Sequence, residues 1–153
     1  MGTTSYLAIR KSIATDIERL AEITVFAKRV AYRPIFNDDV FSFNVLTVTS
    51  VMNVLREYMD DIWVWEDGSI VKGFVHIENN EIKELYVDWF FQRYGIGTKL
   101  FQFALSKGCD FLWVLEHNKN AIVFYEKNGF IVTGEKLEWN DTGQFIMKMI
   151  KNH

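Results

Sequence analysis

The middle of the chain holds three β-rich runs that are separated by very short polar turns. The first two runs, residues 62–66 and 70–77, flank an Asp67-Gly68 pair. An Asp-Gly pair between apolar and β-branched runs is typical of a β-hairpin, because its tight turn needs residues that tolerate a positive φ. Asn79-Asn80 then turns the chain into a third run, residues 82–87. Connections this short join antiparallel strands, so the sequence predicts an antiparallel meander at the centre of the fold.

Helices and further strands are predicted on both sides of this meander. Before it we expect a strand at 6–10 and a helix at 15–27, which begins at the capping-box spacing of Thr15 and Glu18. A loop around Pro34, at 33–44, and a second helix, at 45–59, should follow. After it we expect a helix at 97–107, a strand at 111–115 and a helix at 120–127. Two final strands should follow, at 130–135 and 144–150. This order indicates an α/β (α+β) fold in which helices pack on a mixed sheet.

Size and composition are those of one globular domain that covers residues 1–153. Of the 153 residues, 49% are hydrophobic and 16% aromatic, which is enough apolar surface to offset the entropy lost on folding. A net charge of -3 argues against a nucleic-acid partner. The single Cys109 cannot form an internal disulfide, and Cys and His pairs with zinc spacing are absent, so no metal is expected. With no spanning segment or targeting signal recognised, we expect a cytoplasmic protein that does not bind membranes.

Two closely spaced glycines, Gly95 and Gly97, lie where the third run of the meander meets the next predicted helix. Such a junction suits a phosphate group, because the first N–H groups of a helix have no partner within the helix and glycine lets a ligand approach closely. A glycine-eased turn that binds nothing would show the same pattern. Two nucleotide motifs are excluded, since the dinucleotide fingerprint needs Gly or Ala where Leu100 stands and the P-loop needs Gly-Lys-Ser/Thr where Gly97-Thr98-Lys99 stands.

A second segment makes the combination specific. The motif Gln92-x-x-Gly95-x-Gly97 is followed by Asn118-x-x-Ala121-x-x-Phe124-Tyr125-x-x-x-Gly129-Phe130. In this order the two motifs resemble those of the GCN5-related N-acetyltransferase (GNAT) family, over residues 84–130. The resemblance implies a mostly antiparallel sheet of about seven strands with helices on both faces. It also implies an acyl-CoA cleft between two strands that splay apart, here 84–87 and 111–115. The implied reaction moves the acetyl group of acetyl-CoA to a primary amine of a small molecule or peptide, by direct attack in a ternary complex.

The same resemblance assigns residues to the cosubstrate. The backbone of Tyr86 and Val87 would pair with the pantetheine arm of acetyl-CoA. The pyrophosphate would be held by the loop and helix start formed by Gln92, Arg93, Tyr94, Gly95, Ile96, Gly97 and Thr98, and the other side would be lined by Asn118, Ala121 and Phe124. Position 93 is often glycine in the family, so Arg93 would bring a charge toward a phosphate. Lys119 and Lys127 are candidates for the outer phosphate, although solvated helix charges would look the same.

The implied reaction needs a group that accepts a proton and a group that donates one. A lysine-type amine has a pKa of about 10.4, so its proton must be removed before it can attack the thioester. Strand alternation places Glu84, Tyr86 and Asp88 on one face, and Glu84 is the predicted base. Asp88, Glu81, Glu116 and water are the alternatives. In the family a tyrosine at the position of Tyr125 commonly lies near the thioester sulfur, so Tyr125 is predicted to protonate the departing thiolate.

Several questions stay open at the level of sequence. A non-catalytic acyl-CoA sensor or interaction module with the same fold is the alternative function. The run Trp89-Phe90-Phe91 replaces the proline and polar residue common in the family; core packing is the favoured role, and stacking on the acceptor or adenine and a homodimer contact are the others. The identity of the acceptor amine is not encoded in a motif. Acidic residues at four positions would suit a cationic acceptor if they converge, namely Asp38, Asp39, Glu138 and Asp141.

Overall fold

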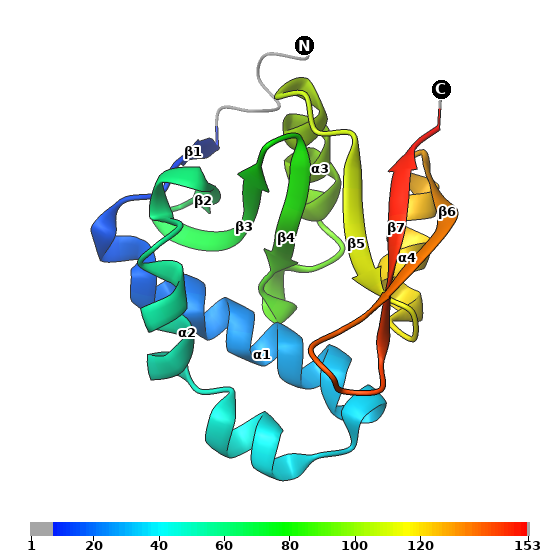
Figure 1. Cartoon of the computed structure of the whole chain (residues 1–153). Helices are drawn as coiled ribbons and strands as arrows, with labels where there is room; N and C mark the ends of the chain where they lie inside the picture. Colours follow the sequence, from blue (N-terminus) through cyan, green and yellow to red (C-terminus); the bar gives the residue numbers. More distant parts are fainter. Residues whose placement is uncertain (1–7, 153) are drawn as a thin grey trace.

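The computed structural model describes residues 8–152, which form a single seven-stranded sheet in the order β1-β2-β3-β4-β5-β7-β6 (Figure 1). The strands are Ile9–Lys11 (β1), Ile62–Asp67 (β2), Ile70–Glu78 (β3), Glu81–Val87 (β4), Phe111–Leu115 (β5), Phe130–Glu138 (β6) and Phe145–Lys151 (β7). Neighbouring strands are antiparallel except β4 and β5, which are parallel. The predicted mixed, mostly antiparallel sheet is therefore confirmed.

The predicted meander is present as β2, β3 and β4. Residues in both of its turns have a positive φ, which explains the choice of glycine and asparagine there; they are Gly68, Ser69, Asn79 and Asn80. The register between β3 and β4 shifts once, between His76 and Ile77. Beyond that shift the four residues 84–87 pair with β3 without interruption, so the predicted alternation along β4 is kept.

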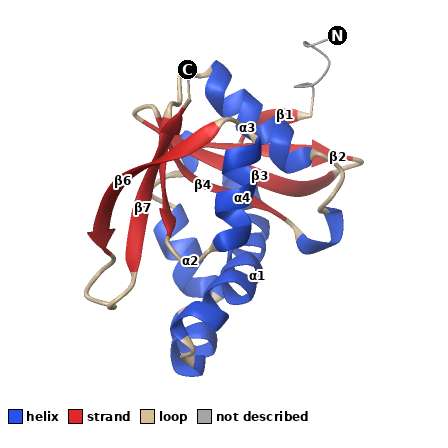
Figure 2. Ribbon diagram, turned by 90° about the vertical axis from the view of Figure 1, so that its right-hand side faces the viewer, coloured by secondary structure: helices blue, strands red, loops and turns tan. Residues whose placement is uncertain are grey.

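Four α-helices among the described residues cover the two faces of the sheet (Figures 1 and 2). Helices α1 (Ile17–Phe36) and α2 (Val48–Leu55) pack on one face, in a core that includes Leu20, Val64 and Phe74. Helices α3 (Ile96–Ser106) and α4 (Lys119–Lys127) pack on the other. No helix in the described part of the chain combines the length and the apolar composition that crossing a membrane requires.

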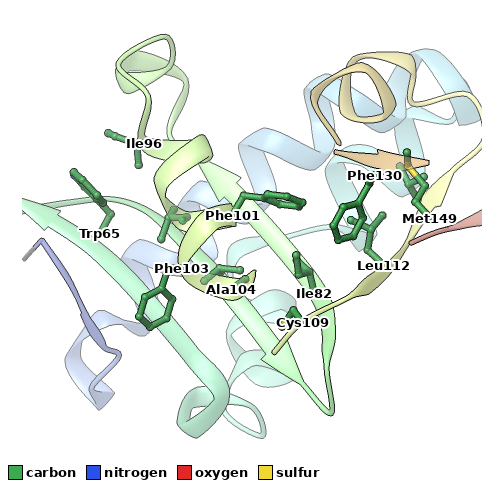
Figure 3. Close-up of a cluster of buried hydrophobic side chains, with 13 residues drawn as sticks. Trp65, Ile82, Ile96, Phe101, Phe103, Ala104, Cys109, Leu112, Phe130 and Met149 are labelled. Atoms are coloured by element: carbon green, nitrogen blue, oxygen red, sulfur yellow. The ribbon is translucent and has the colours of Figure 1, made fainter. Parts of the chain in front are cut away.

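The core under α3 joins the two sequence motifs. Phe101 on α3 has no exposed surface, and its ring contacts Phe130 at 5.0 Å between ring centroids (Figure 3). Cys109 lies at the edge of this core, 2% exposed, and burial raises the pKa of its thiol to about 11. The interpretation of Cys109 as a packed thiol is therefore confirmed.

The N-terminal third departs most from the sequence prediction. Helix α1 continues nine residues past the predicted end, and Pro34 lies inside its last turn instead of in a loop. The helix stops at Asn37, whose left-handed backbone lets its N–H donate to the Arg33 carbonyl at 2.8 Å. A π-helical turn, Phe41–Val45, follows it within the predicted loop at 33–44. Packing of the aromatic side chains near the end of α1 outweighs the loss of one backbone donor at Pro34.

Smaller corrections concern the starts of elements. The first helix is not introduced by a Thr15–Glu18 capping box; the Asp16 carboxylate instead accepts a hydrogen bond from the Ile13 N–H at 2.8 Å. Helix α2 is shorter than the predicted 45–59 segment: it starts at Val48, where the Thr47 hydroxyl accepts from the Ser50 N–H and caps the helix, and it ends at Leu55. Of the predicted first strand, residues 6 and 7 lie outside the described residues.

Candidate active site

Strands β4 and β5 are paired at one end only. Their register contains two pairs, Glu81 with Phe111 and Ile82 with Leu112, after which the strands diverge toward their carboxyl ends (Figure 1). Because β4 and β5 separate beyond this point, the edge of β4 that faces β5 has no strand partner from 83 to 87. A cavity of about 960 Å³ opens at this divergence, between the two strands, α1 and the starts of α3 and α4.

A glycine that the sequence analysis did not single out brings β3 close to β4 at this edge. Gly73 pairs with Val87, and a Cβ built on Gly73 would lie 2.8 Å from the Tyr86 carbonyl oxygen and 3.3 Å from the Val87 Cα. No real Cβ sits that close to a backbone atom, so any larger residue would push β4 away. The only signal in the sequence was a glycine inside a strand, which marks a close backbone approach without saying to what.

The loop after β4 leads directly into α3. The Asp88 carboxylate caps a 3-10 helix, Trp89–Phe91, by accepting from the Phe90 N–H at 2.8 Å, and the Gln92 side-chain amide donates to the Val87 carbonyl at 3.3 Å. Arg93 and Gly95 both have a positive φ, of 70° and 81°, which explains why glycine is suited to either position. Gly95 precedes the first turn of α3 without a side-chain cap, so the cavity meets an uncapped helix start.

The second motif forms α4 and touches the first. Asn118 accepts a hydrogen bond from the Ala121 N–H at 3.4 Å and so begins the helix. The Phe124 ring lies 3.6 Å from the position of a Cβ built on Gly97, in ordinary van der Waals contact. Tyr125 follows with its ring against Phe101 and Phe124, at 5.8 and 5.5 Å between centroids. The two motifs are therefore parts of one wall of the cavity.

Nearly all the residues singled out from the sequence line this cavity. Those that do so are Glu84, Tyr86, Val87, Gln92, Arg93, Gly95, Ile96, Gly97, Thr98, Asn118, Ala121, Phe124 and Tyr125. Tyr94 is the exception, because its side chain is 75% exposed and outside the cavity lining. Of the two lysines considered for an outer phosphate, Lys119 lines the cavity and Lys127 does not.

The carboxylates considered as bases differ in what they contact. Asp88 is held by Arg19, with 2.8 Å between Oδ2 and the guanidinium nitrogen, in addition to its capping bond. Lys136 hydrogen-bonds to Glu116 and lowers the pKa of that carboxyl, and Glu81 pairs with Lys83 at 3.3 Å. Glu84 instead keeps one buried oxygen, Oε2, without a hydrogen-bond partner, 3.8 Å from the Lys28 ammonium. Glu84 is thus the carboxylate that is least committed to a partner.

Three tyrosines stand beside Glu84 in the cavity. Burial raises the pKa of Tyr125, and Tyr32 and Glu84 raise it further. Burial also raises the pKa of Tyr86 and of Tyr32, whose hydroxyl groups are hydrogen-bonding partners of each other. All three hydroxyls therefore keep their protons in the neutral pH range, and each is able to donate one.

Helix α1 and the β6–β7 connection close the side of the cavity opposite α3, and sequence reasoning did not find the residues there. The ring of Tyr32 meets Trp139 edge to face, with 5.7 Å between centroids, and Phe36 completes the aromatic cluster. The acidic residues considered for a cationic acceptor do not converge, since none of Asp38, Asp39, Glu138 and Asp141 lines the cavity. Asp39 pairs with Arg33 instead, and Glu138 accepts from the Gly143 N–H.

The aromatic run after β4 has divided roles. Phe91 packs against the core under α3 and lines the cavity, as the favoured interpretation expected. Trp89 and Phe90 are 54% and 80% exposed, so core packing is wrong for these two residues. The Trp89 ring lies 6.4 Å from the ring of Phe26 on α1, and Trp89 also lines the cavity.

Comparisons with known proteins agree on one family. A family model described as an acetyltransferase (GNAT) domain matches residues 59–132. A probable N-acetyltransferase of Mycobacterium tuberculosis is 34% identical over 88 residues, which are 51% of this chain and 51% of that protein. The chain therefore matches about half the length of this curated relative.

Solved structures match over nearly the whole chain. The apo form of YjaB from Escherichia coli has a TM-score of 0.73 and 25% identity, over 93% of this chain and 95% of that one. A PaiA N-acetyltransferase from Thermoplasma acidophilum, solved in complex with coenzyme A, has a TM-score of 0.64 and 26% identity, over 95% and 98%. Together with the two motifs and the splayed strands, these matches confirm the predicted resemblance to the GCN5-related N-acetyltransferase (GNAT) family.

Proposed function

We propose that the protein is an N-acetyltransferase that moves the acetyl group of acetyl-CoA to a primary amine. The observation that carries the proposal is the one-sided pairing of β4 and β5, which leaves the edge of β4 free along a cavity of about 960 Å³. One end of this edge meets the uncapped start of α3, and the other lies beside Glu84 and the hydroxyls of Tyr86 and Tyr125. The match to an acetyltransferase (GNAT) domain model supports the same activity.

The cavity has the features that acetyl-CoA needs. Backbone groups of Tyr86 and Val87 on the free edge of β4 would pair with the pantetheine arm, as an added strand would. N–H groups at 95–98 point along the axis of α3 and would hold the pyrophosphate, helped by the positive end of the helix dipole. Gln92, Arg93, Asn118, Ala121 and Phe124 would line the remaining contact surface. Tyr94, being outside the cavity lining, is not part of this proposal.

Acetyl-CoA would supply an activated thioester, and the residues of the chain would manage protons and charge. Glu84 would accept a proton from the attacking amine, directly or through water, at the oxygen that has no hydrogen-bond partner. A backbone N–H of the free β4 edge would stabilise the negative charge that develops on the carbonyl oxygen. Tyr125, whose hydroxyl keeps its proton, would donate it to the departing thiolate.

The proposal is tested by incubating the purified protein with acetyl-CoA and a panel of primary amines, which includes polyamines, amino acids, aminoglycosides and lysine-containing peptides. Release of free CoA and the mass of the amine are both measured. We expect CoA release that depends on one class of amine, with a matching acetylated product. Saturable binding of acetyl-CoA without any product would overturn catalysis and favour a non-catalytic acyl-CoA module.

A matched pair of variants tests the role of Glu84. Glu84→Gln should lower kcat about 100-fold near pH 7, because general-base catalysis typically contributes that much. The loss should shrink at alkaline pH, where the free amine is more abundant. Glu126→Gln makes the same change on the exposed face of α4, outside the cavity lining, and should leave kcat unchanged. If Glu84→Gln and the wild type have equal kcat, Glu84 is not the general base, and water would accept the proton instead.

A further inference from the structure

Three potential metal ligands meet on the α1 side of the sheet, and none of them belongs to the cavity lining. Asp61 ends a 3-10 helix, Met59–Asp61, directly before β2, while His76 and Glu78 lie on β3. The antiparallel register pairs Ile62 with His76 and so brings Asp61 beside them. One ligand atom from each of the three side chains lies within 4.8 Å of the other two. None of the three lines the cavity between β4 and β5.

His76 is the member of this cluster that points to a ligand. Its side chain is 5% exposed, and its Nε2 is buried without a hydrogen-bond partner. The ring is held in place by Tyr58, with 5.0 Å between the ring centroids. Its Nε2 is directed at the cluster, 3.5 Å from the Glu78 Oε2. A buried imidazole nitrogen without a partner is unfavourable, and a ligand that binds it removes that penalty.

The chemistry of the donor set selects the kind of ligand. One imidazole nitrogen and two carboxylate oxygens are a typical ligand set for zinc and similar divalent ions. Two ligands about 2 Å from one zinc ion in tetrahedral geometry are separated by about 3.3 Å, close to the Nε2–Oε2 distance observed. The exposed Asp61 side chain is free to adjust and complete the set.

We propose that Asp61, His76 and Glu78 bind a divalent transition metal ion, with Zn²⁺ as the best-fitting ion and water at the remaining position. The ion would join the start of β2 to the end of β3. His76 lies directly opposite Glu84 in the β3–β4 register, so the bound ion would also fix the strand position that supports the cavity. The site does not depend on the proposed acetyl transfer. The proposal departs from the expectation from composition that no metal is bound, because the ligands are brought together by strand register and not by a spaced motif.

The test uses the full chain after treatment with a chelator. Isothermal titration with ZnCl₂ should show one saturable site per chain, and the melting temperature should rise with the metal. X-ray absorption of the zinc complex should show nitrogen and oxygen ligands and no sulfur. Asp61→Asn and Glu78→Gln should each weaken binding at least tenfold, and both changes are conservative at side chains that retain solvent contact.

Two controls separate this site from incidental binding. Asp60→Asn removes the same charge one residue away, outside the cluster, and should bind zinc as the wild type does. His117→Ala removes an exposed histidine that lies 3.7 Å from Glu116, and should also leave binding unchanged. Loss of binding in His117→Ala, unchanged affinity in both Asp61→Asn and Glu78→Gln, or no saturable binding would each overturn the proposal. His76→Asn should abolish binding, and its circular dichroism shows whether it folds; if it does not, the two carboxylate variants decide.

Discussion

Glu84 and Asp88 illustrate how much of the site single residues determine. Glu84 lies on β4, while Asp88 follows the end of this strand and caps the next 3-10 helix, and each is paired with a basic residue of α1. Alternation along a strand is a local property, so the sequence predicts it well. Which carboxylate stays available depends on Arg19 and Lys28, which come from a distant segment. The sequence therefore limits the candidates for the general base to a few carboxylates, and the tertiary contacts distinguish among them.

Tyr125 provides the sharpest test at the scale of one atom. Tyr125→Phe should lower kcat about 10- to 100-fold, because the change removes the hydroxyl that is proposed to protonate the thiolate. The KM for acetyl-CoA should change little, since the ring keeps its contacts with Phe101 and Phe124. Steady-state kinetics with a saturating amine measure both constants. Tyr58→Phe, outside the cavity lining, is the matched control. A Tyr125→Phe enzyme with wild-type kcat would remove the hydroxyl from the mechanism.

Asp16 is a buried residue whose effect depends on pH. Its carboxylate accepts hydrogen bonds from the Arg10 guanidinium at 2.9 and 3.0 Å and from the Ile13 N–H. Arg10 also donates to Glu66, so the cluster joins β1, β2 and the start of α1. Burial opposes the ionisation of Asp16, but these bonds outweigh it and lower its pKa below the usual value.

Asp16→Asn should destabilise the protein by about 1–3 kcal/mol at pH 7, because a partly buried guanidinium loses its charged partner. Since the folded pKa lies below the unfolded value of about 3.9, the contribution of Asp16 is complete above that value and is lost as the pH falls through the folded pKa. Urea unfolding at pH 7 and below pH 4 should therefore show a difference that shrinks in acid. Asp39→Asn removes an exposed pair of similar geometry and should leave the midpoint unchanged. Equal stability of Asp16→Asn and wild type at pH 7 would contradict this account.

At the scale of elements, local sequence signals predict the bounds of helices and strands well next to tight turns. They predict them less well where tertiary packing determines the end of an element. The meander, α3 and α4 lie within a few residues of their predicted positions. The glycine and asparagine residues in turns and the spacing of apolar residues determine these elements within short segments. Helix α1 is longer than predicted, and Pro34 lies within its last turn instead of in a loop. In the structure, contacts of the end of α1 with Trp139 compensate for the missing N–H. Such contacts are not visible in the sequence around Pro34.

The approach of β3 to β4 leads to a prediction that concerns the two strands together. Gly73→Ala should cost about 1–3 kcal/mol, as overpacking typically does, because its Cβ would meet the Tyr86 carbonyl. It should also weaken acetyl-CoA binding, since the displaced backbone belongs to the proposed pantetheine edge. Urea unfolding and isothermal titration measure the two effects. Gly68→Ala, in the β2–β3 turn with nothing within 4 Å, should be strained but should bind acetyl-CoA normally. Normal binding of acetyl-CoA by the Gly73→Ala variant would contradict the proposal that this edge of β4 contacts the cosubstrate.

At the scale of the whole molecule, the two faces of the sheet support different parts of the cavity. The core under α3 and α4 positions the glycines and Tyr125, while the core under α1 positions Lys28 and Tyr32 next to Glu84. The free edge of β4 lies between these two cores. A ligand that pairs with this edge would bridge both halves of the sheet, and its binding energy would add to the stability of the complete fold.

Acetyl-CoA should therefore raise the melting temperature of the whole protein. At 100 times the Kd, linkage predicts a gain of about 2.7 kcal/mol in the free energy of unfolding. Amide hydrogen exchange should slow most at 83–87 on β4 and at 95–98 at the start of α3. The exposed edge strand β6 serves as the internal control and should change only with global stability. A melting temperature that does not respond to acetyl-CoA would contradict the assignment of the cavity.

The sequence by itself determined the order of the elements, the antiparallel centre of the sheet and the resemblance to the GNAT family. It did so because turn residues, hydrophobic period and spaced motifs are properties of short segments. The tertiary structure decided that one oxygen of Glu84 has no hydrogen-bond partner, that Gly73 meets the Tyr86 carbonyl and that Asp61 lies beside His76. Each of these facts depends on the register and packing of segments that are far apart in the chain. No local pattern specifies such contacts, because their energies come from partners on other elements.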